Sequence, residues 1–77
     1  MLAELGMPRE LIDSSVIASM GYAAEQRILQ LEFRSGDVYR YFDVPVEEYL
    51  AFRSADSKGT YLNQVFKLRG YRYIRIR

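Results

Sequence analysis

The chain contains no histidine, no cysteine and no tryptophan among its 77 residues. The absence of cysteine excludes disulfide bridges, thiolate nucleophiles and thiolate metal sites. The absence of histidine removes the usual general base at neutral pH and the commonest metal ligand. Zinc sites, Ser-His-Asp triads and Cys-His dyads are therefore excluded, and we expect no metal ion, no cofactor and no enzymatic activity.

Long apolar runs and targeting signals are also missing. No apolar run approaches the ~18 residues that a membrane span needs. The start of the chain carries an acid and no basic stretch, which is unlike a signal peptide. A chain of 77 residues is also near the lower limit of what folds unaided. We therefore expect one small cytoplasmic domain that does not contact a membrane.

The charges are divided unevenly along the chain. Residues 1–56 carry five bases and ten acids, a sum of −5, and residues 57–77 carry six bases and no acid, a sum of +6, so that the two add to the net charge of +1. Such a division predicts an anionic partner for the basic part. Alternatively, the acidic part of the protein itself faces the basic part.

The hydrophobic pattern predicts strands first and helices later. The predicted elements are strands over residues 15–22, 27–33 and 38–44, helices over 45–54 and 58–68, and a last strand over 71–77. The order β-β-β-α-α-β predicts a small single α+β domain with an antiparallel β-meander of three strands, two helices and a C-terminal strand. Residues 1–12 lack a clean period, so we expect a loosely ordered N-terminal arm before a single domain over residues 13–77.

The turn between the second and third predicted strands leaves two registers open. A two-residue loop at Ser35-Gly36 would place Tyr39 and Tyr41 away from the main core. A three-residue loop with Gly36 as a bulge residue would shift the pairing by one and place both tyrosines in the core. The sequence is compatible with both registers.

The first predicted helix has a clear apolar stripe. Val46, Tyr49 and Leu50 share one side at helical spacing, and we expect this side to face the core. Glu47 and Glu48 lie in the first turn, where the helix dipole favours anions. Because they are sequential, they point in different directions and do not share a reaction centre.

Two segments rich in tyrosine and arginine are candidate nucleic-acid-binding sites. Tyr39-Arg40-Tyr41 would present rings on which unpaired bases stack, and Arg69–Arg77 is a basic stripe with interleaved aromatic residues. Each segment has a structural alternative: the tyrosines pack beneath the helices, and the arginines protect a sheet edge. The candidate binding residues are Tyr39, Arg40, Tyr41, Lys58, Lys67, Arg69, Tyr71, Arg72, Tyr73 and Arg75.

Two functions follow from these segments. The first is a non-catalytic module that binds RNA, with cations on phosphates and tyrosines on bases, and with an affinity that falls with salt by a log–log slope of about −0.7 per phosphate contact. The second is a module for protein–protein interaction or self-association, in which the C-terminal strand adds to another sheet or the acidic and basic halves associate.

Several short motifs also follow one another in a characteristic order. They are Ser14-Ser15-x-Ile17, Gly21-Tyr22, Leu31-x-Phe33-x-x-Gly36-x-Val38-Tyr39-x-Tyr41-x-x-Val44-Pro45, Ala55-Asp56-Ser57-Lys58-Gly59-x-Tyr61-x-Asn63 and Tyr71-x-Tyr73. As an ordered set, they resemble the KTSC domain over residues 13–73. This family occurs at the C-terminus of some lysyl-tRNA synthetases and as free-standing bacterial proteins. The resemblance implies a domain type and a candidate partner, RNA (tRNA or single-stranded), but no established activity.

Overall fold

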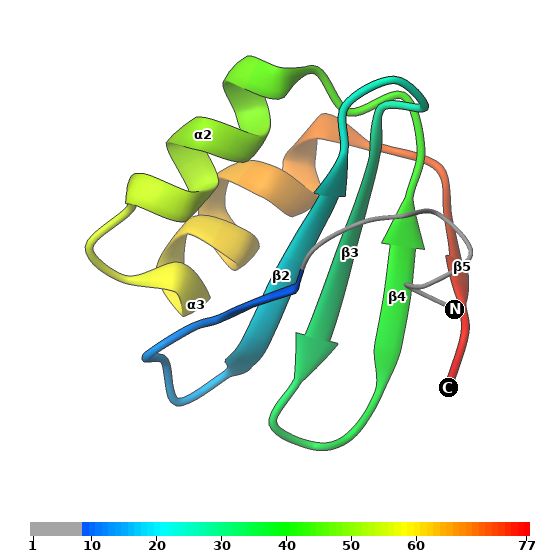
Figure 1. Cartoon of the computed structure of the whole chain (residues 1–77). Coiled ribbons are helices and arrows are strands. Elements are labelled where there is room, and N and C mark those ends of the chain that lie inside the picture. The colour runs from blue at the N-terminus through cyan, green and yellow to red at the C-terminus, as the bar shows by residue number, and fades with distance from the viewer. Residues whose placement is uncertain (1–8) are drawn as a thin grey trace.

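The computed structural model describes residues 9–77, which fold as one antiparallel sheet with helices on one of its faces (Figure 1). The strands are β1 (Arg9–Leu11), β2 (Ile17–Ala23), β3 (Ile28–Phe33), β4 (Val38–Tyr41) and β5 (Tyr73–Arg75), in the spatial order β1-β2-β3-β4-β5. The helical segments are α2 (Val46–Ser54), α3 (Lys58–Tyr61), the π-helical turn η1 (Leu62–Phe66) and the 3₁₀ turn η2 (Lys67–Arg69). The predicted α+β class and element order are confirmed, with β1 as an additional strand.

Strand β1 lies within the segment that we expected to be a loosely ordered arm. Arg9–Leu11 pairs antiparallel with β2, and Ile12 is buried in the core. This end of the arm is therefore part of the sheet, because the free edge of β2 offers its backbone hydrogen-bonding partners. The rest of the expected arm, residues 1–8, lies outside the described residues.

A bulge in β2 changes which of its residues face the helices. Ile17 pairs with Phe33 and Ser19 pairs with Glu32, so the register shifts between Ile17 and Ser19. Simple alternation along a strand would place Ile17 and Met20 on opposite faces of the sheet. The extra residue in the bulge brings both side chains into the core, where each is fully buried.

The β3–β4 turn adopts the longer of the two possible loops. Phe33 N–H donates to the carbonyl of Asp37 at 2.9 Å, and Gly36 N–H donates to the carbonyl of Phe33 at 2.9 Å. Gly36 has a φ of +100°, which glycine adopts without steric cost. The resulting register places Tyr39 and Tyr41 on the helix-covered face of the sheet, and Tyr41 is only 8% exposed.

Replacement of Gly36 tests the turn that sets this register. We expect Gly36→Ala to lower the free energy of unfolding by about 1–2 kcal/mol, because a side chain is strained at positive φ. No atom lies near the added methyl group, so the loss would come from the backbone alone. Urea denaturation followed by circular dichroism measures it. Ser35→Ala in the same turn is the control, and an equal loss in both variants would contradict the explanation.

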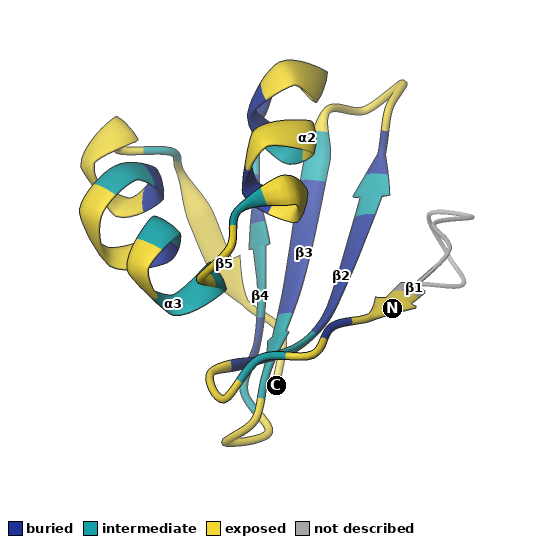
Figure 2. Cartoon of the chain, turned by 90° about the vertical axis from the view of Figure 1, so that its left-hand side faces the viewer, coloured by how far each residue is buried: buried dark blue, intermediate teal, exposed yellow. Residues whose placement is uncertain are grey.

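The core lies between the sheet and the helical layer (Figure 2). From α2, the buried side chains are Glu48 and Phe52, whereas Val46 and Leu50 are 43% and 47% exposed. The predicted apolar stripe of this helix is therefore wrong except for Tyr49, which is partly buried. The helix is rotated so that Phe52 packs among other aromatic rings and Glu48 meets three hydrogen-bond donors.

The second helical region starts and ends as expected. Ser57 caps α3, since its hydroxyl oxygen accepts from the backbone N–H of Thr60 at 3.2 Å. Gly70 ends η2 in the left-handed conformation, with a φ of +73°. Leu62 and Phe66 are buried between these ends. Among residues 9–77, no helix is long and apolar enough to cross a membrane.

Candidate functional site

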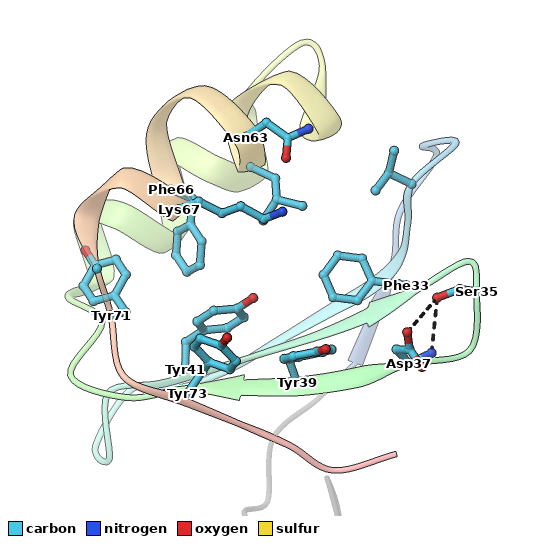
Figure 3. A pocket seen from close by; sticks show the side chains of 13 residues that line it. Phe33, Ser35, Asp37, Tyr39, Tyr41, Asn63, Phe66, Lys67, Tyr71 and Tyr73 are labelled. Atoms are coloured by element: carbon cyan, nitrogen blue, oxygen red, sulfur yellow. Dashed lines mark hydrogen bonds between the residues drawn. The ribbon is translucent and has the colours of Figure 1, made fainter.

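An open cleft of about 940 Å³ separates the helical layer from the end of the sheet formed by β3, β4 and β5. Figure 3 shows that the tyrosines of β4 and β5 form its floor and that η1 and η2 form the opposite wall. We call this the aromatic cleft, after the ring-bearing residues that line it: Phe33, Tyr39, Tyr41, Phe66, Tyr71 and Tyr73. Its volume lies in the range of small-molecule and cofactor sites.

The tyrosine rings of the floor are arranged as a continuous surface. The ring centroids of Tyr39 and Tyr41 are 6.3 Å apart with nearly parallel planes, and Tyr73 lies 5.5 and 5.4 Å from them. Tyr41 is buried beneath Phe66, whereas Tyr73 is 55% exposed. Burial raises the pKa of Tyr41 to about 12, so this hydroxyl is neutral at physiological pH. The accessible rings are therefore those of Tyr39 and Tyr73.

Polar side chains stand at the rim of the aromatic cleft. Asn63 and Lys67 extend from the helical side, and Ser35 and Asp37 come from the β3–β4 turn (Figure 3). Among residues 9–77, Lys67 is in none of the ion pairs or side-chain hydrogen bonds. Asp37, in contrast, accepts from Arg75 at 2.8 Å. The rim thus offers one unpaired cation beside an aromatic floor.

A buried carboxylate holds the closed end of the aromatic cleft together. Glu48 is 6% exposed and accepts hydrogen bonds from the Tyr61 hydroxyl, the Tyr71 hydroxyl at 2.9 Å and Arg69 Nε at 2.8 Å. Burial opposes its ionisation, but the three donors outweigh burial and lower the pKa of Glu48 below its ordinary value. Burial and the bond to Glu48 raise the pKa of Tyr71 to about 12. Glu48 therefore fixes the Tyr71 ring in the wall of the cleft.

Two of the predicted phosphate-binding arginines lie on the other side of the sheet. Arg40 pairs with Ile74, and its Nε donates to Gln30 at 2.8 Å on the face that no helix of residues 9–77 covers, which we call the helix-free face. Arg72 is placed on the same face by alternation along β5, with its guanidinium 4.5 Å above the ring of Phe42. The structure therefore does not bring Arg40 and Arg72 together with the tyrosines of the aromatic cleft.

The arginines of residues 57–77 are each paired with an acid from the first part of the chain. The pairs are Arg69 with Glu48, Arg72 with Asp43, Arg75 with Asp37 and Arg77 with Glu32, at N–O distances of 2.8, 3.9, 2.8 and 3.3 Å. Of the two explanations for the uneven charge, the structure thus realises the intramolecular one. The pairs of Arg72, Arg75 and Arg77 are largely exposed and are each worth only about 0–1 kcal/mol, whereas Arg69 is bound to the buried Glu48.

The remaining predicted cation, Lys58, lies apart from the aromatic cleft. Its ammonium donates to the carbonyl of Ala55 at 2.6 Å, and it lines a second, polar hollow beside the start of α3. Of the ten predicted residues, the aromatic cleft is lined by Tyr39, Tyr41, Lys67, Tyr71 and Tyr73, and Arg75 reaches its rim at Asp37. Among residues 9–77, no three acidic side chains are grouped so as to hold a metal ion.

Sequence reasoning missed three residues that build the cleft. Phe33 packs edge-on against Tyr39, Phe66 packs edge-on against Tyr41, and Glu48 anchors Tyr71. The two phenylalanines carried only the signal of ordinary core residues. Glu48 carried none, because an acid in the first turn of a helix is usually exposed.

Comparison with known proteins gives one consistent family. The family model of the KTSC domain matches residues 13–73. An uncharacterised protein of Stutzerimonas stutzeri is 51% identical over 70 residues, which are 91% of this chain and 99% of that protein. A lysine–tRNA ligase of Nostoc punctiforme is 38% identical over 55 residues, which are 71% of this chain but 10% of the ligase. The crystal structure of a KTSC domain protein from Yersinia pestis superposes with a TM-score of 0.86 at 35% identity, covering 92% of this chain and 99% of that one.

Proposed function

This chain belongs to the KTSC domain family, and we propose that it is a non-catalytic module that binds single-stranded RNA by holding an unpaired base in the aromatic cleft. The observation that carries the proposal is the joint presence, in one open cleft, of accessible tyrosine rings and an unpaired lysine. Flat rings attract bases by stacking, and the lysine attracts the phosphate attached to the same nucleotide.

The floor of the cleft suits a base better than it suits an aliphatic ligand. The rings of Tyr39 and Tyr73 touch each other, with centroids 5.5 Å apart, so that together they offer a wider surface to a flat group than one ring does. Stacking of a base on an aromatic side chain is worth about 1–3 kcal/mol. Asn63 at the rim supplies an amide that donates to and accepts from a base edge.

The cation content of the site predicts a weak dependence on salt. Lys67 is the unpaired cation at the rim among residues 9–77, and Arg75 is already bound to Asp37. One phosphate contact on single-stranded RNA corresponds to a log–log slope of about −0.7. We therefore expect the affinity for RNA to depend less steeply on salt concentration than the six bases of residues 57–77 would imply.

Two further observations support this function. A relative of this chain is named lysine–tRNA ligase, and a region similar to this chain forms a tenth of it. The proposal that the module is non-catalytic is supported by the state of Glu48, the buried acid among residues 9–77. Its lowered pKa and three bound donors keep it ionised and make it a weak base at neutral pH.

Fluorescence anisotropy with labelled single-stranded RNA and with tRNA, at ~50 and ~200 mM salt, tests the proposal. We expect binding that Tyr73→Ala weakens by about 5- to 150-fold, the equivalent of one stacked base. Lys67→Gln should remove most of the salt dependence. Tyr73 is more than half exposed, so its replacement leaves the core intact.

Matched controls lie on the helix-free face. Phe42→Ala removes a ring, and Arg72→Gln removes a charge, both away from the aromatic cleft. Neither substitution should change the affinity for RNA more than about twofold. Both side chains lie on the other face of the sheet from the proposed site, and the exposed charge of Arg72 is largely screened there. Absence of binding at the lower salt concentration, or an equal loss in Arg72→Gln and Lys67→Gln, would contradict the proposal.

A further inference from the structure

Among residues 9–77, no strand pairs with the outer edge of β5, which runs along the mouth of the aromatic cleft. In the sheet of residues 9–77, β5 pairs with β4 alone, and its three residues are all exposed. The carbonyl of Arg72 and the N–H of Ile76 point inward to β4, so alternation turns the N–H and C=O groups of Tyr73 and Arg75 outward. Such a row of free donors and acceptors is a template for another strand.

Charged side chains often protect such an edge, but those of this segment are directed elsewhere. The guanidinium of Arg75 reaches along β4 to Asp37, the residue before this strand, and that of Arg77 reaches to Glu32 on β3. Arg72 lies over Phe42, next to the end of β4. The arginines therefore fold back over their own sheet, and no side chain of these arginines covers the outer backbone of β5.

The side chains of this segment define what an added strand would contact. Tyr73 lies on the cleft face, and Ile74 and Ile76 are exposed large apolar residues on the helix-free face. An added strand would thus find apolar partners on both faces. Residues 67–77 carry five bases and no acid, and the four arginines among them stay more than half exposed although each is paired with an acid, so acidic side chains of an added strand can contact the same guanidinium groups. A second copy of β5 fits less well, since it would bring two such basic segments together.

We propose that the outer edge of β5 binds an extended peptide segment of a partner protein by strand addition, and that this segment alternates apolar and acidic residues. Backbone hydrogen bonds to Tyr73 and Arg75 provide the affinity, and the apolar and acidic side chains provide the selectivity. The site consists of the outer backbone of Tyr73 and Arg75 and not of the ring surfaces of the cleft floor, so strand addition does not depend on the RNA proposal.

A synthetic capped heptapeptide of alternating valine and glutamate is a suitable probe. Addition of this peptide should slow hydrogen exchange of the Tyr73 and Arg75 amides at least tenfold, as measured by NMR. A peptide with lysine in place of glutamate should give no such protection. Unchanged exchange at both amides, equal protection by the two peptides, or protection that arises without peptide through a concentration-dependent dimer in light scattering would overturn the proposal.

Two substitutions of Arg75 distinguish the contribution of its backbone N–H to peptide binding from the contribution of its charge. Arg75→Pro removes an outward N–H without removing a bond to β4, and proline is tolerated at such edge positions. It should weaken peptide binding at least tenfold more than Arg75→Gln, which keeps the N–H and loses the same charge. Equal binding by the two variants would exclude strand addition. If Arg75→Pro does not fold, hydrogen exchange of the Tyr73 and Arg75 amides in the unmodified protein still tests strand addition.

A third variant separates this site from the proposed RNA site. Tyr39→Ala changes the cleft floor and leaves the backbone of β5 in place. It should weaken RNA binding and change peptide affinity less than threefold. Loss of peptide binding in Tyr39→Ala would show that the peptide occupies the aromatic cleft instead of the edge, which would overturn the strand-addition proposal.

Discussion

Glu48→Ala is expected to lower the free energy of unfolding by about 3 kcal/mol, because three hydrogen-bond donors lose one charged acceptor. The side chain of Glu48 is 4% exposed, so water does not replace it at the hydroxyls of Tyr61 and Tyr71. Arg69 is about half exposed and regains water, which keeps the loss below that of a fully buried pair. Urea denaturation followed by circular dichroism measures the difference.

Ionisation of Glu48 also makes the stability of the protein depend on pH. The pKa of Glu48 is lower in the folded protein than its ordinary value of 4.5, so the folded state binds fewer protons than the unfolded state. Its contribution to stability is therefore fully present above pH ~4.5 and is lost as the pH falls through the folded pKa. The difference in stability between the unmodified protein and Glu48→Ala should shrink between pH 7 and pH 3.

The neighbouring acid provides the control for both measurements. Glu47 lies in the same turn of α2 but is exposed. Glu47→Ala should change stability by less than about 0.5 kcal/mol. If Glu47→Ala and Glu48→Ala were equally destabilised, the effect would belong to the helix dipole rather than to the buried carboxylate.

Phe66→Ala should have the larger effect on stability. Phe66 is 1% exposed and packs against Tyr41, Phe52 and Tyr71, with ring centroids 4.8–5.1 Å apart. Removal of a buried phenylalanine ring costs about 3–5 kcal/mol. A domain of this size has a total stability of roughly 4–12 kcal/mol, so the variant would be near the limit of folding. Thermal denaturation should show a fall in Tm of more than about 12 °C.

Phe66→Ala also links stability to the aromatic cleft, since Phe66 forms the helical wall over the tyrosine floor. The control is Leu68→Ala two residues later, where the side chain is 79% exposed. It should change stability by less than about 0.5 kcal/mol and leave ligand binding intact. A similar fall in Tm for both variants would mean that η1 and η2 are held by their helical backbone and not by the packing of Phe66.

Much of the fold could be predicted because its signals are local. The strand alternation of Leu29, Leu31 and Phe33, the cap at Ser57 and the stop at Gly70 each depend on a few adjacent residues. The β-β-β-α-α-β order followed from these signals and was confirmed. Strand β1 could not be predicted, because three residues of mixed character become a strand only when an open edge of β2 lies beside them.

The candidate site was predicted only in part, because composition identifies the aromatic and charged residues but not the face of the sheet on which each lies. Tyr39, Tyr41, Tyr71 and Tyr73 stood out by composition, and all four line the cleft. The arginines also stood out, but a sequence does not show which face of a sheet a side chain takes when the register is open. Arg40 and Arg72 proved to lie on the helix-free face, one residue away from tyrosines on the other face.

By itself, the sequence determined what chemistry is available to this protein. Without cysteine and histidine it has no thiolate and no imidazole, and its tyrosines, arginines and lysines are the groups left to contact a partner. The tertiary structure decided where those groups stand. The Gly36 turn shifted β4 by one residue and turned its tyrosines inward, and the rotation of α2 buried Glu48 among donors that lie far from it in sequence. Both outcomes depend on contacts between distant segments, which no local pattern of residues specifies.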